Sequence, residues 1–280
     1  MRNKAFIYAI VPGIVCTSRR VSVFGRPFAY LRKMNTENFY CGTSGIVLPV
    51  PNKQAFPEAF RTGTRLTYYA SLFNSLEVNS SFYKIPLQKT LARWTEEVPA
   101  DFRFTLKLWR GITHTPNLSF SSADVDRFMQ AARGIGSKKG CLLVQLPPAI
   151  KANKAGQLER LLEMIQQHDT GWRLAVEFRD KSWYTPATDE LLERFNTSRV
   201  LQDMPASAIW EPMSFSYFIY LRYHGPTGNY KGGYPEERLK RDAHRIKNWL
   251  RDAKEVYVYF NNTIDGAFPN GQTLIGELYP

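Results

Sequence analysis

Two glutamates and a histidine lie where short β-rich runs of this 280-residue sequence end, in the segments SLEVNS, AVEFRD and YLRYHG. We predict that Glu77, Glu177 and His224 are catalytic, because carboxyl and imidazole groups are the usual proton carriers of enzymes. Two carboxyl groups ~5–10 Å apart would suit the acid/base pair of a glycoside hydrolase. The alternative is that neighbouring cations neutralise each glutamate and lower its pKa, and that His224 only caps its loop.

Cationic side chains occupy the same kind of position. Lys107, Arg179 and Arg222 stand in or directly after β-rich runs, where they would suit a phosphate or carboxylate group. Amide, imidazole and carboxylate groups at the other ends could complete an anionic ligand's contacts, and two aromatic residues in polar loops could stack on a base or sugar ring. The predicted substrate-binding residues are therefore the three cations with Asn79, His114, Gln145, Trp183, Asp203, Tyr230, Asn261 and Asn262.

A divalent metal is the less favoured interpretation of this set. Five members are of types that ligate such ions: Glu77, His114, Glu177, Asp203 and His224. No two of them have the close spacing of metal ligands, and the interspersed cations would repel a metal ion. We therefore predict no metal and no cofactor.

The residues that must position this site alternate between two kinds of pattern. Eight β-rich runs occur at 39–42, 75–79, 103–108, 141–146, 173–178, 199–202, 218–223 and 255–260. Stretches with helical spacing of apolar residues lie between them, at 66–73, 87–97, 123–132, 158–167, 187–195 and 236–253. This alternation favours an α/β fold, a single (β/α)8 TIM-type barrel over residues 37–280, over an open doubly wound sheet.

Two parts of the predicted barrel look irregular. The segment 204–216, after strand six, has little helical pattern, and the piece after Asn262 is short. In such a barrel the active site lies at the carboxyl ends of the strands, where all eight runs end in polar residues. Alternate strand residues share a face, so Glu77 falls with Asn79, Glu177 with Arg179 and Arg222 with His224. The alternative to a site is a ring of satisfied salt bridges that closes the end of the barrel.

Seven motifs follow one another in an order that resembles a known family. They are CGTSG (41–45), SLEVNSSFYKIP (75–86), FRFTLKLWRGITH (102–114), LLVQLPP (142–148), AVEFRDKSW (175–183), YLRYHG (220–225) and VYVYFNN (256–262). The sequence is similar in these motifs to the domain-of-unknown-function 72 family, also called YecE-like, over about residues 39 to 270. The resemblance implies a TIM-type barrel and no particular reaction.

The net charge of +12 comes mainly from one end of the chain. Residues 1–33 hold seven of the 37 Lys and Arg and none of the 25 Asp and Glu, so the remainder carries 30 − 25, or +5. A globular surface can carry that charge without a nucleic-acid partner. We expect residues 1–36 to be a basic extension that is disordered, or to reflect a misassigned start, with the barrel beginning at residue 37. The extension has a short apolar stretch but no small-x-small cleavage site of a signal peptide.

Composition excludes several other classes. The chain is 44% hydrophobic and has no apolar run of ~20 residues, which favours a folded protein without a membrane partner. Its three cysteines have no CxxC or metal-like spacing, as expected in a reducing cytoplasm. We therefore expect an enzyme, hydrolase-like or isomerase/lyase-like, that binds a small anionic, sugar-like or nucleotide-like substrate. A nucleic-acid-binding or nucleic-acid-processing barrel is the alternative, and the sequence leaves the oligomeric state open.

Overall fold

The computed structural model describes residues 37–168 and 171–280, so the predicted N-terminal extension lies outside the described residues. All eight predicted β-rich runs form strands, and the sixth is divided at Val200 into two short ones. The strands are β1 (Phe39–Thr43), β2 (Ser75–Val78), β3 (Arg103–Lys107), β4 (Lys139–Gln145), β5 (Arg173–Glu177), β6 (Ser198–Arg199), β7 (Leu201–Gln202), β8 (Phe218–Tyr223) and β9 (Glu255–Phe260).

The strands form two parallel sheets, which confirms the α/β class. One sheet has the order β1-β9-β8-β7 and the other β2-β3-β4-β5-β6. Neither sheet is a continuous ring, but they meet at two places. Ser44, directly after β1, forms a parallel bridge with Glu77 of β2, and Ser198 Oγ of β6 donates to the Phe218 carbonyl of β8 at 2.9 Å.

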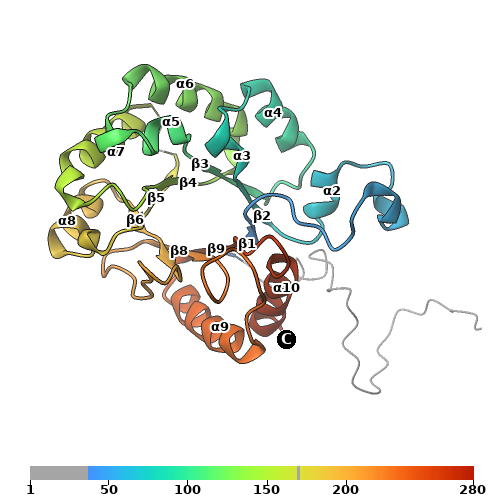
Figure 1. The fold of residues 1–280 in the computed structure, drawn as a ribbon. Coiled ribbons are helices and arrows are strands. Elements are labelled where there is room, and N and C mark those ends of the chain that lie inside the picture. Colours follow the sequence, from blue (N-terminus) through green and yellow to red (C-terminus); the bar gives the residue numbers. More distant parts are fainter. Residues whose placement is uncertain (1–36, 169–170) are drawn as a thin grey trace, which may run out of the picture.

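Helices surround the strands, as Figure 1 shows for α4, α6, α7, α8, α9 and α10. The six predicted helical stretches are all present. The helices are α2 (Arg65–Tyr69), α3 (Ser80–Tyr83), α4 (Gln88–Glu96), α5 (Arg110–Thr113), α6 (Ser122–Ala132), α7 (Ala155–His168), α8 (Pro186–Arg194), α9 (Glu236–Arg251) and α10 (Ala267–Leu278). No helix within 37–168 or 171–280 is both long and apolar enough to cross a membrane.

One of the two expected irregular units is regular. The segment 204–216 contains no helix, as predicted, but the C-terminal piece forms α10, a helix of 12 residues. Pro269, Gly271 and Gly276 weaken its sequence signal, because proline and glycine are poor helix formers. Burial of its apolar side chains against the strands stabilises the helix, since Leu274 and Ile275 are almost fully buried.

The strands have a buried cluster on each face. The larger cluster packs strands against helices, while a smaller one gathers side chains from alternate positions of both sheets: Cys141, Leu143, Ala175, Val200, Phe218, Tyr220, Tyr257 and Tyr259. Tyr259 also hydrogen-bonds across the sheets to Thr105 Oγ1, at 2.7 Å. The two sheets therefore face each other through this inner cluster, and their carboxyl ends lie at one end of the molecule.

Candidate functional site

Arg222 is the centre of a buried charge network at the carboxyl ends of the strands. Its Nε donates to Glu77 Oε2 at 3.0 Å and its Nη2 to Glu77 Oε1 at 2.7 Å, while its Nη1 donates to Glu177 Oε2 at 2.8 Å. All three side chains are at most 1% exposed. Parallel pairing places them at this end, because Arg222 on β8 pairs with Gln202 and Glu177 on β5 pairs with Gln145. The predicted convergence of polar strand ends is therefore real for these residues.

Both glutamates are held as carboxylates. Burial acts to raise the pKa of Glu77, but Arg222 and the hydroxyls of Ser44 and Tyr220, which donate to the carboxylate, outweigh it and hold the pKa below 4.5. Burial likewise opposes ionisation of Glu177, but Arg179 and Arg222 bring its pKa well below 4.5. This geometry matches the alternative expected from the sequence, in which neighbouring cations neutralise each glutamate. Both carboxyl groups are therefore ionised at neutral pH.

His224 lies beneath the two arginines and is fully buried. Its Nε2 is 2.9 Å from Arg179 Nη2 and 3.3 Å from Arg222 Nη1. A guanidinium can only donate, so Nε2 accepts and the proton of a neutral ring sits on Nδ1. Nδ1 is 3.3 Å from Asp203 Oδ1, which also accepts from the His224 amide at 2.7 Å. Glu177 Oε1 lies 3.3 Å from Nε2 as well, so a doubly protonated ring would have a carboxylate beside each nitrogen.

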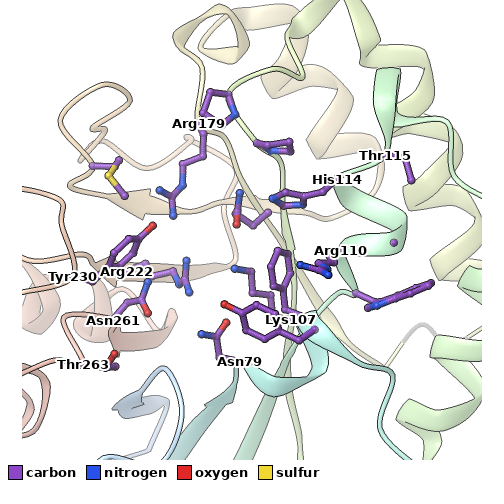
Figure 2. Close-up of a pocket in the computed structure, with 18 of the residues that line it drawn as sticks. Asn79, Lys107, Arg110, His114, Thr115, Arg179, Arg222, Tyr230, Asn261 and Thr263 are labelled. Carbon is purple, nitrogen blue, oxygen red and sulfur yellow. The ribbon is translucent and has the colours of Figure 1, made fainter.

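A cleft of about 1120 Å³ opens above this network. Figure 2 shows that Lys107, Arg179, Arg222 and His114 extend towards it from different strands and loops. The described residues that line it include four cations, Lys107, Arg110, Arg179 and Arg222, and no aspartate or glutamate. The remaining lining residues are Asn79, Phe82, Tyr83, Trp109, Gly111, His114, Thr115, Pro116, Gln145, Pro147, Pro148, Met204, Ala206, Tyr230, Asn261 and Thr263.

Positive charge is left over in the cleft after the ion pairs are counted. Glu77 and Glu177 balance Arg222 and Arg179. Within the described parts of the chain, the side chain of Lys107 makes no ion pair or hydrogen bond, and its Nζ lies 4.0 Å from the centre of the Phe82 ring. Arg110 stands exposed at the rim, 6.0 Å from the Tyr83 ring, and likewise has no carboxylate partner among these residues. The cleft is thus cationic at its wall.

Two lining groups have pKa values displaced towards their neutral forms. Burial, and then the charges of Arg222 and Arg179, lower the pKa of Lys107 to about 7, although Glu177 and Glu77 oppose the shift. Burial and then Lys107 lower the pKa of His114 to about 4, so its imidazole is neutral at pH 7. His114 Nδ1 is 2.9 Å from Thr113 Oγ1. Near neutral pH the cleft therefore presents an amine that can take up or release a proton and an imidazole that is neutral.

Comparison with known proteins assigns the family. The profile of the family "Protein of unknown function DUF72" matches residues 40–278. The chain belongs to the DUF72 family. The UPF0759 protein YunF of Bacillus subtilis is 23% identical over 254 residues, which cover 79% of this chain and 88% of that protein. This confirms the family indicated by the seven motifs.

Solved structures of DUF72 proteins share the fold. A DUF72 family protein from Enterococcus faecalis superposes with a TM-score of 0.72 at 20% identity, over 86% of this chain and 96% of that one. A DUF72 family protein from Thermotoga maritima gives a TM-score of 0.68 at 24% identity, over 86% of this chain and 98% of that one. At these identities the likeness concerns the fold.

Eight of the predicted site residues of this DUF72 member line the cleft: Asn79, Lys107, His114, Gln145, Arg179, Arg222, Tyr230 and Asn261. The three predicted catalytic residues lie beneath it, with Asp203 behind His224. Tyr230 is 39% exposed and has a positive φ of 65°, an uncommon backbone conformation for a tyrosine. The location of Glu77, Glu177 and His224 does not test whether they take part in a reaction, so their catalytic assignments stay predictions.

Besides Asp203, two predicted substrate-binding residues lie away from the cleft. Trp183 is fully buried, stacks on Phe178 with ring centres 4.6 Å apart and donates from Nε1 to the Ile150 carbonyl at 2.7 Å. Asn262 donates to the Gly232 carbonyl at 2.7 Å and to Asn270 Oδ1 at 3.0 Å. Both therefore hold loops rather than face the cavity. The polar neighbours of Trp183 in sequence predict a place in the site, but its ring packs inwards.

Several lining residues were not predicted. Arg110 follows the β3 run by only three positions, and that nearness to Lys107 was the available signal. Phe82, Tyr83 and Trp109 lie in the motifs SLEVNSSFYKIP and FRFTLKLWRGITH, and they also line the cavity. Thr115, Met204 and Thr263 lie in loops with no motif that would single them out. In residues 37–168 and 171–280, no group of three or more His, Cys, Asp or Glu side chains is arranged to hold a metal ion.

Proposed function

We propose that the two sheets form one (β/α)8-type barrel, and that the cleft at its carboxyl end is the active site of an enzyme for small anionic substrates. The substrate would carry a phosphate or carboxylate group, on a sugar-like, nucleotide-like or simpler skeleton. The observation that carries this proposal is the cationic wall without carboxylates, in which Lys107 and Arg110 have no anionic partner of their own.

The barrel is supported by the contacts where the sheets meet. If β6 and β7 count as one strand, the described residues form eight strands, in the order of a TIM-type barrel. The Gly45 amide donates to the Glu77 carbonyl at 2.8 Å, which continues the ladder from β1 to β2. The inner cluster is what the filled interior of such a barrel requires.

Anion binding follows from the balance of charges. An anion bound in the cleft could form ion pairs with Lys107 and Arg110, which have no carboxylate partner among the described residues. Side-chain donors of Gln145, Asn261 and Thr263 could complete its hydrogen bonds. A rim arginine and a buried lysine at different depths suit a ligand that has an anionic group and a polar skeleton.

We assign the buried network a positioning role in this enzyme. Glu77 and Glu177 hold Arg222 and Arg179 in place, and His224 with Asp203 supports the same two guanidinium groups from below. Near neutral pH the glutamates stay ionised and the His114 imidazole stays neutral, whereas the Lys107 amine has a pKa of about 7 and can take up or release a proton. Acid/base chemistry therefore passes to Lys107 in our proposal.

A thermal-shift screen tests the proposal. Its probes are sulfate, inorganic phosphate, pyruvate, a hexose phosphate, a nucleoside monophosphate and a short oligonucleotide. A ligand at 100 times its dissociation constant stabilises by ~2.7 kcal/mol, or roughly 5–10 °C for a domain of this size. We expect a small anion to produce this shift, and Arg110→Gln to reduce it.

Arg194→Gln is the matched control, because it also removes one positive charge but from an exposed pair with Glu159. Equal loss in both variants would mean that only overall charge matters. A shift produced only by the oligonucleotide, and steeply lost with salt, would replace the small-substrate site with the nucleic-acid alternative.

A further inference from the structure

Lys107 is the cleft residue whose chemistry is least explained by anion binding alone. It ends β3 with its side chain 7% exposed, and its backbone is fixed by the Ser81 hydroxyl, which contacts both the Lys107 amide and its carbonyl. Its Nζ faces the Phe82 ring at 4.0 Å instead of a carboxylate. The ring face attracts the ammonium form without neutralising it, and Arg110 at the rim provides a permanent positive charge.

The surroundings of Lys107 favour its neutral amine, which is the nucleophilic form. Burial is the first cause and the nearby guanidinium groups of Arg222 and Arg179 the next, and together they bring the pKa to about 7. The charged or titratable groups that face it are these two arginines, Glu77 and Glu177 beneath them, and His114. At neutral pH a substantial fraction of the lysine is therefore unprotonated.

We propose that Lys107 forms an imine with the carbonyl carbon of its substrate, which is therefore a small anion bearing an aldehyde or ketone group, such as a 2-oxo acid or a ketose phosphate. This inference rests on the proposed function and deepens it. Arg110, which has no carboxylate partner among the described residues, would hold the anionic group while the carbonyl carbon meets the Lys107 amine inside the cleft.

The step balances without any further reactant. The Nζ lone pair forms a bond to the carbonyl carbon as the C=O π pair moves to oxygen, and a proton passes from nitrogen to that oxygen to give a carbinolamine. The C–O bond then breaks as the oxygen takes a second proton, the one that the ammonium form of the lysine released to water before the attack, and leaves as water. The product is a protonated imine, so the ammonium form of the lysine and a carbonyl compound yield an iminium ion and one water molecule.

Two neighbours suit these proton movements. His114 is a neutral imidazole in the same cleft and can relay a proton. Asn79 also lines the cleft, and its side-chain amide can hydrogen-bond the carbinolamine hydroxyl. An iminium ion so formed would draw electrons from the adjacent carbon, which is how lysine enzymes activate carbonyl substrates.

Reductive trapping tests the inference. The full chain is incubated at neutral pH with cyanoborohydride and pyruvate or dihydroxyacetone phosphate, and the modified peptides are mapped by mass spectrometry. We expect one reduced ligand on Lys107 with at least one of the two anions, little with neutral acetone, and protection by excess sulfate. The two arms separate a carboxylate substrate from a phosphate substrate.

Lys138 provides an internal control on the same chain. Burial lowers the pKa of this lysine too, but its Nζ donates to the carbonyls of Thr95 and Val98, both at 2.6 Å, outside the cleft. Lys138→Arg should leave trapping unchanged, whereas Lys107→Arg should abolish it. Mapping on the parent chain decides the matter even if Lys107→Arg folds poorly.

The failures of the two proposals can be told apart. Modification spread evenly over surface lysines, or none on Lys107 while sulfate still stabilises the protein, overturns the imine and leaves the anion site standing. If Lys107 is not trapped and sulfate does not bind, both proposals are overturned.

Discussion

Arg222 Nε and Nη2 donate to the two carboxylate oxygens of Glu77, at 3.0 Å and 2.7 Å, with both side chains buried. The remaining guanidinium nitrogen, Nη1, reaches Glu177 at 2.8 Å. One arginine on β8 thus ties β2 to β5 across the end of the molecule. A buried ion pair gives little net stability relative to an apolar replacement, but removal of one partner leaves an uncompensated charge. The network should therefore be intolerant of single substitutions.

Arg222→Met is the direct test of that expectation. It leaves Glu77 and Glu177 buried with Arg179 as their remaining neighbouring guanidinium, and should lower the free energy of unfolding by about 3–5 kcal/mol. Urea denaturation measures the change. Arg194→Met, which breaks the exposed pair with Glu159, should cost under about 1 kcal/mol. A similar small loss in both variants would contradict the buried network.

Acid should weaken the fold through the same glutamates. Their pKa values are lower in the folded protein than the ordinary 4.5, so the folded state binds fewer protons than the unfolded one. The stability that they contribute is present above pH 4.5 and is lost as the pH falls below it towards the folded-state pKa values. Unfolding free energies measured from about pH 6 down to pH 3 should fall with a steeper slope than in the triple variant Glu77→Gln, Glu177→Gln, Arg222→Met. Equal slopes would mean that the carboxylates are not held ionised.

The fold was predictable to the extent that local pattern and burial agree. The eight strands could be predicted, because each is a short apolar or alternating segment in which both faces are buried. Helix α10 could not, because its stability comes from packing and not from its glycine- and proline-containing sequence.

The same distinction separates the parts of the site. Arg222, Glu77 and Glu177 could be brought together from sequence, since carboxyl ends of parallel strands converge. The sequence could not predict which of these side chains face the cavity, because that depends on ion pairs between strands distant in the chain. Trp183 shows the limit most plainly: a tryptophan among polar neighbours gives no sign of whether its ring turns inwards.

Two glycines in α10 should respond oppositely to alanine. A Cβ at Gly271 would lie 2.7 Å from Phe73 Cε1, so Gly271→Ala should cost roughly 1–3 kcal/mol through overpacking. Gly276 has nothing within 4 Å of such a Cβ, and Gly276→Ala should stabilise by about 0.5–1 kcal/mol through helix propensity. Thermal unfolding of the two variants measures both changes. The same sign for both would be inconsistent with the position of α10 against Phe73.

Tyr234 should secure the orientation of His224. Its hydroxyl donates to Asp203 Oδ2 and accepts from the Gly225 amide at 2.6 Å, while Asp203 contacts the His224 ring. Tyr234→Phe leaves those groups unsatisfied and should cost about 1–3 kcal/mol. It should also change the nitrogen chemical shifts that report the His224 tautomer in NMR spectra. Tyr217→Phe, at an exposed position, is the control, and unchanged His224 signals in Tyr234→Phe would refute the link.

The anion-binding cleft is tested most directly by calorimetric titration with sulfate at about pH 8, in buffers of different ionisation enthalpy. Because the pKa of Lys107 is about 7, the amine is mostly neutral at this pH, and an anion beside it raises that pKa. We predict that sulfate binds with uptake of a substantial fraction of one proton, and that Lys107→Met binds it more weakly and without this uptake. The absence of sulfate binding, or identical proton uptake by the parent and by Lys107→Met, would contradict the account.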